Sequence, residues 1–524
     1  MTTEAHTIDP VVYARRWKTL GVLALSLLII GLDNTILNVA LPSLQSHFHT
    51  SVSSLQWIVD SYLLVFAGLL LTMGTLGDRF GRKKALLSGM VLFGGASLAV
   101  LLVQSAGQLI AVRAAMGAGA ALIMPATLSI ITNVFPREER AKAISVWAGM
   151  AAVGIGLGPL FGGLLLHWFS WSSVFLVNVP VAAAAIVLGV QLVPESRDPQ
   201  PGAFDFPGAA LSIAALVALV YAIIEVPAKG GHDPLVLGAF GAAIALAWAF
   251  VAWELRTSEP MLNLGFFKNA RFTIGSFAIA VAFFSLLGSI FGVTQYLQLA
   301  HGYSALQAGA AMVPIAVGLI VGAGSSVKLV ARIGTTNVVA SGLAALGAIL
   351  AGSLLWTPHM AYWPLGLWFF GGALAMGWIM APATDSVMGA VPPSKAGVAS
   401  AMNDVSRQVA GALGTAIIGS LIASLYASRL NGELDTLPTG ARQSAQDSIG
   451  AAHVVASHLP HSQATQLVAS SGHAYTDALG IGLAVAAAIA VSAAVVVKRR
   501  LPARDLPVAT TSPAADQRAA LAAS

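Results

Sequence analysis

The sequence predicts an all-α integral membrane protein with fourteen transmembrane helices, and three observations lead to this fold class. Hydrophobic residues make up 57% of the chain and charged residues 9%, whereas a soluble domain carries about 25% charged residues. Apolar runs of about 20 residues, the length that spans a bilayer as a helix, recur along the chain. Lys and Arg are concentrated in alternate loops between these runs, as expected for a multi-pass protein.

The apolar runs define the predicted helices. They lie at 18–40, 54–75, 84–104, 108–132, 143–167, 173–193, 206–226, 235–254, 272–298, 305–328, 336–356, 361–387, 398–426 and 475–497. A polar N-terminal segment precedes the first run, and no small-residue cleavage site follows it, so we expect this run to remain as a helix. The chain has no cysteine, which excludes disulfides and thiolate metal sites.

The distribution of the 27 Lys and Arg residues predicts the orientation. With the N-terminus in the cytoplasm, all but five of them fall on the cytoplasmic side, where loops are enriched in cations. The exceptions are Lys229, Arg429 and Arg442 outside and Arg113 and Arg407 within helices. We therefore predict a multi-pass protein of the cell (inner) membrane with both termini cytoplasmic. The net charge of +5 then reflects topology and does not indicate nucleic-acid binding.

A weak internal repeat predicts the domain organisation. Gly81 and Gly89 are eight residues apart after the second run, and Gly334 and Gly342 repeat this spacing 253 residues later, after the tenth run. Parallel repeats of this kind occur in transporters whose halves are related by an axis along the membrane normal. The predicted parts are a cytoplasmic segment (1–17), an N-terminal six-helix bundle (18–193), two inserted helices (206–254), a C-terminal six-helix bundle (272–497) with an external loop (427–474), and a cytoplasmic tail (498–524).

The external loop 427–474 is polar and rich in Ala, Ser and Gln, and we expect it to be partly helical. Ten of the eleven histidines fall on the external side of the predicted topology. They are either solvated loop residues or sensors of external pH near their ordinary pKa of about 6.5. The group His453, His458, His461 and His473 has loose spacing and no companion carboxylate, so we predict neither a metal site nor a bound cofactor.

The first helix carries the strongest candidate for function, Asp33, within an apolar run. A charged Asp at the centre of a membrane helix costs roughly 3 kcal/mol, so such a residue usually faces protein or water and has a role. Asn34 and Asn38 are four residues apart on one helix face and extend the polar patch beside it. The alternative is an Asp that only hydrogen-bonds to a neighbouring helix.

Two further charged residues are predicted to lie in the same layer as Asp33. From the rise of 1.5 Å per residue, Asp33 lies about 13 Å below the external surface, Asp60 about 9 Å and Arg113 about 8 Å. Burial favours the neutral carboxyl and a nearby guanidinium favours the charged one. A proton-coupled carrier needs this competition, because its proton binding must depend on what fills the cavity. The alternative is a static buried ion pair.

Asp404 and Arg407 form a second candidate site, on the thirteenth predicted helix. They are three residues apart and can pair on one face. Asp404 lies about 12 Å from the cytoplasmic surface by the same arithmetic. It is predicted either to bind protons or cations or to form an intrahelical ion pair only.

Small residues and aromatic residues on the helices suggest a moving, adaptable pathway. The fifth helix carries Gly154, Gly158, Pro159, Gly162 and Gly163, a set that permits close helix contact and a kink. Side chains that could line a substrate cavity, beside Asn34 and Asn38, or simply pack helices, are Trp57, Tyr62, Met124, Trp147, Phe284, Tyr296 and Trp378.

Together, four segments resemble signatures of the major facilitator superfamily, and within it the fourteen-span family of drug:proton antiporters. They are LDNTILNVALP (32–42), GTLGDRFGRKKAL (74–86), RAAMGAGAALIMPA (113–126) and GIGLGPLFGG (154–163). The second of them matches the loop signature at Gly74, Asp78, Arg79, Gly81, Arg82 and Lys83. The corresponding segment of the second half lacks the Asp.

The resemblance implies the major facilitator fold and export by alternating access. Asp78 and its neighbouring cations would form a cytoplasmic latch, the fifth-helix glycines would form the antiporter motif, and Asp33, Asp60, Arg113 and Asp404 would couple transport to protons. The implied function is a monomeric, proton-coupled antiporter that exports amphipathic cationic or neutral lipophilic compounds. Two alternatives remain: an exporter of lipid or cell-envelope precursors, and a non-transporting membrane receptor. We do not expect an enzyme, because no nucleophile–base pair or phosphate-binding loop is present.

Overall fold

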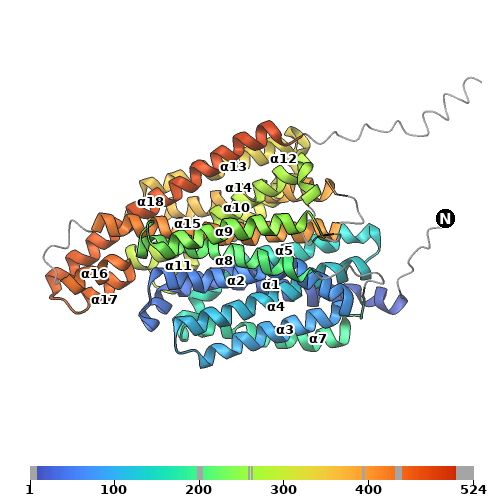
Figure 1. Ribbon diagram of the computed structural model, residues 1–524, viewed down its shortest axis with the longest axis horizontal. Helices are drawn as coiled ribbons and strands as arrows, with labels where there is room; N and C mark the ends of the chain where they lie inside the picture. The colour runs from blue at the N-terminus through green and yellow to red at the C-terminus, as the bar shows by residue number, and fades with distance from the viewer. Residues whose placement is uncertain are drawn as a thin grey trace, which may run out of the picture.

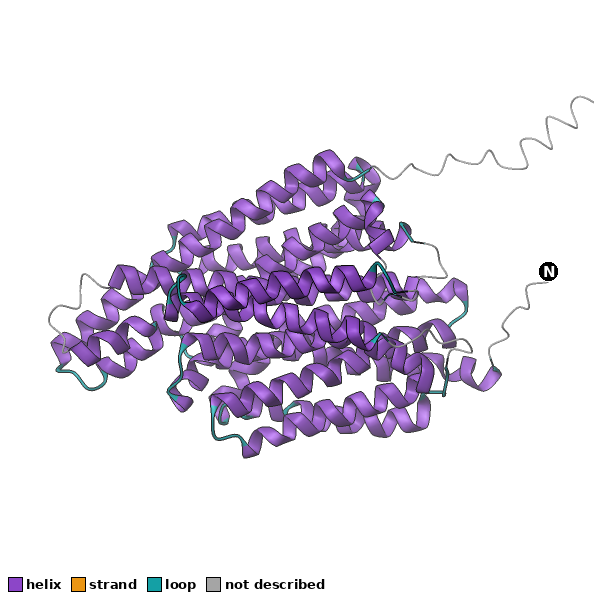
Figure 2. Cartoon of the chain, viewed as in Figure 1, coloured by secondary structure: helices purple, strands orange, loops and turns teal. Residues whose placement is uncertain are grey.

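The computed structural model describes residues 9–197, 205–257, 260, 264–391, 396–430 and 439–502, which form helices and loops with no strand among them (Figure 2). Within these residues, 14 helices are long and apolar enough to cross a membrane. This number confirms the sequence prediction. Figure 1 shows the long helices lying side by side along the long axis of the molecule.

The chain forms the helices in the predicted order. Residues up to 192 form α1 (Pro10–Phe48), α2 (Val52–Phe80), α3 (Arg82–Ala99), η1 (Val100–Leu102), α4 (Ala106–Val134), α5 (Arg137–Trp168), α6 (Ser173–Leu176) and α7 (Asn178–Leu192). The inserted pair is α8 (Phe206–Lys229) and α9 (Pro234–Glu254). The remainder forms η2 (Leu264–Lys268), α10 (Ala270–Gln295), η3 (Tyr296–Ala300), α11 (Ala305–Ala311), α12 (Val313–Ile333), α13 (Thr335–Ala351), η4 (Gly352–Leu355), α14 (Tyr362–Gly389), α15 (Ala396–Leu430), α16 (Thr439–Asp447), α17 (Ile449–Ala456) and α18 (His461–Arg500).

Serine caps start several of the spans. The hydroxyls of Ser51 and Ser105 accept hydrogen bonds from backbone N–H groups in the first turns of α2 and α4. Ser304 and Gln307 form a reciprocal capping box at the start of α11. These side chains satisfy N–H groups that have no partner within the helix. They fix where each helix begins after a short loop.

Two hydrophobic cores organise the helices. One consists mainly of buried side chains of α1 to α7, with a few from α8, α10 and α15, and the other consists of buried side chains of α10 to α18. The α8 helix packs on α9 and also contacts α2 and α15, so it lies along the line where the two groups of helices meet. Figure 1 shows α8 and α9 between the blue N-terminal helices and the yellow-to-red C-terminal ones.

The predicted repeat has a structural counterpart at two glycines. Gly81 separates α2 from α3 with φ of 116°, and Gly334 separates α12 from α13 with φ of 80°. The two glycines are 253 residues apart, and each is the single residue between two consecutive helices. Both have a positive φ, which glycine adopts more readily than other residues. The two halves therefore share the same short connection between equivalent helices.

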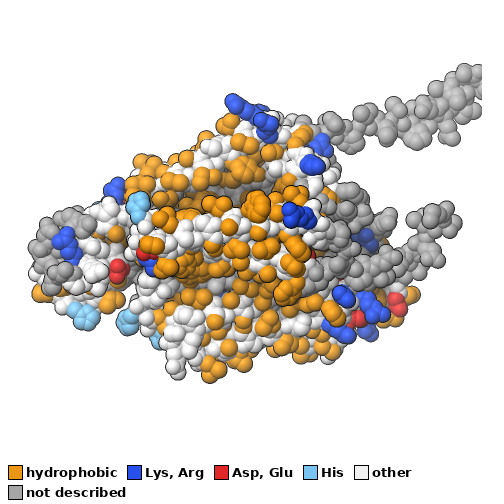
Figure 3. Space-filling view, in the orientation of Figure 1, with side chains coloured by type: hydrophobic (Ala, Val, Ile, Leu, Met, Phe, Trp, Pro, Cys, Tyr) orange, Lys and Arg blue, Asp and Glu red, His pale blue; other side chains and the backbone are white. Residues whose placement is uncertain are grey.

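The two ends of the molecule differ in charge. We call the end that carries Arg82, Lys83, Arg332 and Lys498 the basic face, and the opposite end, with His47, His232, His301 and His453, the histidine face. Figure 3 shows most of the visible Lys and Arg toward the right-hand end, and the visible His, with a few Lys and Arg, toward the left-hand end. The sequence predicts that the basic face is cytoplasmic.

The segment predicted as the external loop, 427–474, is largely helical where it is described, as expected. It contains the end of α15, then α16 and α17, and the start of α18, while residues 431–438 lie outside the described residues. The Tyr426 hydroxyl donates to the Ala445 carbonyl at 3.0 Å, and the Gln45 amide donates to the Ser448 hydroxyl at 2.6 Å. This segment therefore docks on the histidine face and connects α15 with α1.

Candidate functional site

A buried ion pair joins α1 and α4, as the depth calculation predicts. The Arg113 guanidinium lies 2.6 Å from Asp33 Oδ2, and the side chains are 2% and 0% exposed. Both residues thus face protein and not lipid. Removing one partner of such a pair leaves an uncompensated buried charge, which is strongly destabilising.

Contacts with α2 fix the orientation of the guanidinium. Arg113 Nε donates to the Ile58 carbonyl at 3.1 Å, and the guanidinium carbon lies 4.3 Å from the centre of the Tyr62 ring. A cation over an aromatic face in a desolvated site gains about 2 kcal/mol. Three helices therefore converge on Arg113, which has little freedom to move away from Asp33.

The second oxygen of Asp33 is occupied by a residue that the sequence analysis did not identify, Asn178. Its Nδ2 lies 3.2 Å from Asp33 Oδ1 and 3.4 Å from the Ser97 hydroxyl. Asn178 is the first residue of α7 and is 1% exposed. Its only sequence signal is an amide side chain within the apolar run 173–193.

Asp60 is buried but is not part of this ion pair. The residue is 0% exposed, and neither carboxyl oxygen has a hydrogen-bond partner among the described residues. Asp60 lies one turn from Gln56 on the same face of α2, and Gln56 bonds to carbonyls of α15. The structure thus brings together Asp33 and Arg113 and leaves Asp60 unpaired on the α15 side of α2.

The second predicted site is also an ion pair. Arg407 lies 3.2 Å from Asp404 Oδ1, within α15. The guanidinium also donates to the Thr384 hydroxyl at 3.3 Å and lies 5.6 Å from the centre of the Phe283 ring. The site therefore connects α15 with α14 and α10, within the C-terminal helices.

The predicted cavity residues lie in several places, and their role stays a prediction. Asn34 and Asn38 continue the α1 face near Asp33, and Tyr62 lies under Arg113. Trp147 of α5 donates to the Thr127 hydroxyl of α4, which in turn donates to the Met124 carbonyl. Trp57 lies beside Tyr221 of α8, Phe284 packs against the C-terminal core, Tyr296 packs on Trp356 near the histidine face, and Trp378 donates to Ser325 of α12. The structure does not gather these last four side chains around the Asp33 pair.

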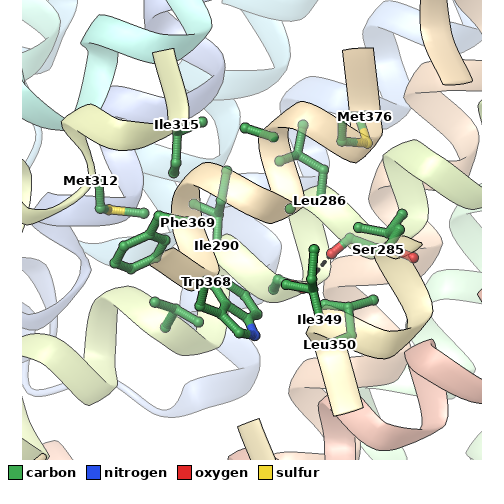
Figure 4. Close-up of a pocket in the computed structure, with 15 residues that line it drawn as sticks. Ser285, Leu286, Ile290, Met312, Ile315, Ile349, Leu350, Trp368, Phe369 and Met376 are labelled. Carbon is green, nitrogen blue, oxygen red and sulfur yellow. Dashed lines mark hydrogen bonds between the residues drawn. The ribbon is translucent and has the colours of Figure 1, made fainter. Parts of the chain in front are cut away.

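A small cavity lies inside the C-terminal helices, apart from both ion pairs. It measures about 40 Å³ and is enclosed by α10, α12, α13 and α14. Figure 4 shows Leu286, Ile290, Phe369 and Met376 around it, with Ser285 as one of its few polar side chains. None of the predicted site residues lines this cavity, so it is a packing void within one half.

The loop signature on the basic face forms a compact network within the N-terminal half. Asp78 Oδ1 pairs with Arg82 Nε at 2.7 Å, and Lys83 Nζ donates to the Val190 carbonyl at 2.8 Å. The Arg79 guanidinium lies 5.8 Å from the centre of the Phe80 ring. Gly74 packs against Pro125 of α4. The predicted latch residues are thus bonded within their own half in this conformation.

The glycines of α5 contact two different partners. Gly154, Gly158 and Gly162 lie four residues apart and face α1, where an added Cβ would meet the α1 backbone. Gly163 faces the other half, where an added Cβ would collide with the Ala305 carbonyl of α11. The Pro159 carbonyl also lies against α11, at Gly309. This motif therefore packs α5 within its half on one side and against the C-terminal helices on the other.

Three glutamines form hydrogen bonds between the halves near the histidine face, and the sequence analysis identified none of them. Gln45 of α1 bonds to Ser448. Gln56 of α2 donates to the Thr415 and Ala416 carbonyls at 3.2 and 3.1 Å. Gln298 of η3 donates to the Val39 carbonyl at 2.8 Å. We call the boundary that these bonds cross the seam.

We expect the substitution Gln56→Leu to open the seam more often, because it removes two hydrogen bonds worth about 0.5–1.5 kcal/mol each. The chain has no cysteine, so spin labels can be attached at Ser170→Cys and His359→Cys, on opposite halves. Pulsed electron paramagnetic resonance measures the distance between the two labels. The fraction of molecules with a long label–label distance should be several-fold larger in Gln56→Leu than in the parent protein. The matched control is Gln295→Leu, since among the described residues the Gln295 amide donates within its own helix α10, to the Phe291 carbonyl. Equal distance distributions for the two variants would contradict the prediction.

The comparisons with known proteins agree with this architecture. Residues 23–415 match the family described as Major Facilitator Superfamily, and the chain therefore belongs to that superfamily of membrane transporters. It is 37% identical to the multidrug efflux pump LfrA of Mycolicibacterium smegmatis, over 92% of this chain and 96% of that protein. It is 34% identical to the tetracenomycin C resistance and export protein of Streptomyces glaucescens, over 80% and 78% of the chains. It is also 34% identical to the methyl viologen resistance protein SmvA of Salmonella typhimurium, over 88% and 93%.

Among solved structures, the fold resembles a bacterial homologue of the human lysosomal transporter Spinster in an inward-facing, unoccupied conformation. The TM-score is 0.63 at 18% identity, covering 93% of this chain and 98% of that one. This likeness shows the shared fold.

Proposed function

We propose that this protein is a monomeric, proton-coupled antiporter that exports amphipathic cationic or neutral lipophilic compounds by alternating access. It would act in the cell membrane with the basic face and both termini in the cytoplasm. The relatives support drug efflux, since their names describe multidrug efflux, antibiotic export and resistance to a toxic cation. The predicted cation asymmetry supports the orientation.

One observation supports the proposal of proton coupling. Two carboxyl groups are buried in the N-terminal half, and one of them is paired with a cation while the other is not. Asp33 bonds to Arg113, whereas both oxygens of Asp60 lack a partner among the described residues. A guanidinium keeps its proton in a protein, so only the carboxyls can exchange one. A buried carboxyl without a partner is stable in its neutral form. In the observed conformation, Asp60 would therefore be protonated, whereas Asp33 would be charged and paired with Arg113.

The cycle follows from where the halves touch. Near the histidine face, α5 packs on α11 and the glutamines bond across the seam, so this conformation is closed on that side. Substrate would enter from the basic face, compete with the proton of Asp60 and leave after the seam opens. Asp404, paired with Arg407, would be a second exchanging carboxyl in the C-terminal half.

The driving force is sufficient for strong accumulation outside. Each elementary charge that crosses 100 mV contributes about 2.3 kcal/mol, and each pH unit contributes about 1.4 kcal/mol. One proton per cycle under both gradients therefore supplies about 3.7 kcal/mol. For a neutral substrate, this energy supports a gradient of more than two decades. A monovalent cation leaves against the membrane potential, so it needs a second proton per cycle to exceed about one decade.

The test uses purified protein in proteoliposomes, with tetraphenylphosphonium as the cation. An imposed pH gradient should drive uphill transport by the wild type. Asp60→Asn should abolish uphill transport and keep at least part of the exchange between labelled and unlabelled cation, because exchange needs binding but no net proton movement. Asp477→Asn, at an exposed ion pair with Arg429, is the control and should behave as the wild type. Uphill transport by Asp60→Asn at the wild-type rate would refute the role of Asp60.

The same vesicles separate the substrate classes. Labelled phospholipid should not be moved by the wild type under the gradient that drives tetraphenylphosphonium. Transport of the lipid without transport of the cation would overturn the drug-efflux proposal in favour of lipid export. Binding of the cation without any flux would overturn transport itself.

A further inference from the structure

We propose that Asn178 is a positioning residue that holds the Asp33 carboxylate in its charged form against Arg113, and so sets the pH at which Asp33 exchanges its proton. This inference rests on the proposed function, since it assigns a pH range to one of the coupling carboxyls. It adds a third group, from a third helix, to the pair of Asp33 and Arg113.

The geometry around Asp33 supports this role. The carboxylate lies between two donors, with Arg113 Nη1 at 2.6 Å from Oδ2 and Asn178 Nδ2 at 3.2 Å from Oδ1. Each oxygen thus accepts one hydrogen bond, and the two donors come from α4 and α7. All three side chains are at least 98% buried. Hydrogen bonds to the charged form favour that form.

The orientation of the amide follows from the charges. Asn178 presents its NH₂ group to Asp33 and to the Ser97 hydroxyl, and its Oδ1 has no partner among the described residues. An amide oxygen turned toward the carboxylate would repel it, so the donor end must face Asp33. A residue that served only to join α7 to α3 would need no contact with the acid.

Few other titratable groups surround Asp33. Arg113 of α4 is the paired cation, and the Tyr62 hydroxyl and Asp60 belong to α2. The described stretch of α5 that packs against this part of α1, residues 149–163 without 152, has no titratable side chain. α6, α7 and α11 have none, and α10 has only Arg271 in its first turn. α17, which meets α1 near Gln45, has only His453. Asn178 is therefore the neutral group through which the charge of Asp33 can be adjusted without adding or removing a charge.

The sign of the expected effect follows directly. Removing the amide donor destabilises the charged carboxylate relative to the protonated one, so the proton is held to a higher pH. In Asn178→Ala, the midpoint of proton release should rise by about one pH unit, a tenfold change in proton affinity. Asn178→Asp is isosteric, replaces the donor by a second carboxylate and should raise the midpoint further. Asn178→Gln keeps an amide donor and should recover part of the shift.

Two measurements report the midpoint. The first is proton release on adding saturating tetraphenylphosphonium to detergent-solubilised protein that carries Asp60→Asn, so that the Asp60 proton does not contribute. The release is followed with a pH dye across a series of starting pH values, with and without the Asn178 substitutions. The second is an infrared titration of the carboxyl C=O band in ligand-free protein, assigned to Asp33 by its loss in Asp33→Asn. Ser26→Ala removes a buried hydroxyl that bonds to Val22 of its own helix, and it should leave both midpoints unchanged.

The outcomes distinguish this inference from the proposed function. If Asn178→Ala folds and binds the cation but keeps the wild-type midpoint, or loses transport equally at every pH, Asn178 is only structural and the inference is wrong. If Asn178→Ala does not fold, Asn178→Gln and Asn178→Asp provide the same comparison of midpoints. If the wild type releases no proton on binding, the proposed coupling fails, whereas the infrared titration still tests the effect of Asn178 on Asp33.

Discussion

Asp33→Asn is expected to abolish proton-driven efflux and to lower the stability of the protein. The substitution removes one of the proposed coupling carboxyls and leaves Arg113, which is 2% exposed, without its counter-charge. Removing one partner of a buried pair costs about 3–5 kcal/mol. Uphill transport of tetraphenylphosphonium in proteoliposomes should fall to the level of empty vesicles, and thermal unfolding in detergent should occur at a lower temperature.

A double variant separates the two effects. Asp33→Asn with Arg113→Gln removes both charges, so it should recover most of the lost stability but none of the transport. A single variant as stable as the wild type would argue that the guanidinium finds another counter-charge. Recovery of uphill transport in the double variant would show that neither charge couples protons.

Gly163→Leu is expected to hold the histidine face open. An added Cβ at this position would collide with the Ala305 backbone across the seam, and a backbone carbonyl cannot turn away as a side chain can. Overpacking of this kind costs about 1–3 kcal/mol, which shifts a two-state equilibrium about 5- to 150-fold. In a Val39→Cys background, a membrane-impermeant maleimide added at the histidine face should react faster by a factor in this range. Transport should fall because closure on that side becomes rare.

Two other glycines of α5 provide controls. Gly162→Leu would press on Ile36 of α1 within one half, so it should lower stability without faster labelling. Gly149→Leu meets no atom within 4 Å at its Cβ, so both labelling and transport should match the parent. Equal labelling rates in Gly162→Leu and Gly163→Leu would mean that the effect comes from general loosening and not from the seam.

The sequence predicted the fourteen spans well because the physics of a bilayer acts on composition alone. A helix that spans the hydrocarbon must be about 20 residues long and mostly apolar. Each such helix therefore appears in the sequence as an apolar run of that length. The ion pair between Asp33 and Arg113 was predicted for a similar reason. Helical rise fixes the depth of each side chain, and two opposite charges at one depth in an apolar medium gain strongly from meeting.

The depth of each residue in the membrane did not predict which other side chains contact the Asp33–Arg113 pair. It placed Asp60 in the same layer as Arg113, but the direction of a side chain around the helix axis and the identity of the neighbouring helix depend on packing. In the structure, Asp60 is not bonded to Arg113 and shares a face with Gln56, toward α15. Asn178 and the seam glutamines were not predicted, because burying an amide in a membrane helix costs less free energy than burying a charge. An amide in an apolar run is therefore a weaker signal of function than a charged residue. Two of the glutamines bond to backbone carbonyls, which every residue possesses.

The seam joins the two halves through amide groups that carry no charge. Gln45, Gln56 and Gln298 donate to a hydroxyl or to carbonyl oxygens, and none of these groups titrates between acid and alkaline conditions. Closure of the histidine face should therefore not depend on the pH of the solution in contact with it. In the proposed orientation, this face points away from the cytoplasm. The signal to open it would then come from the substrate and the proton bound inside, and not from the external pH.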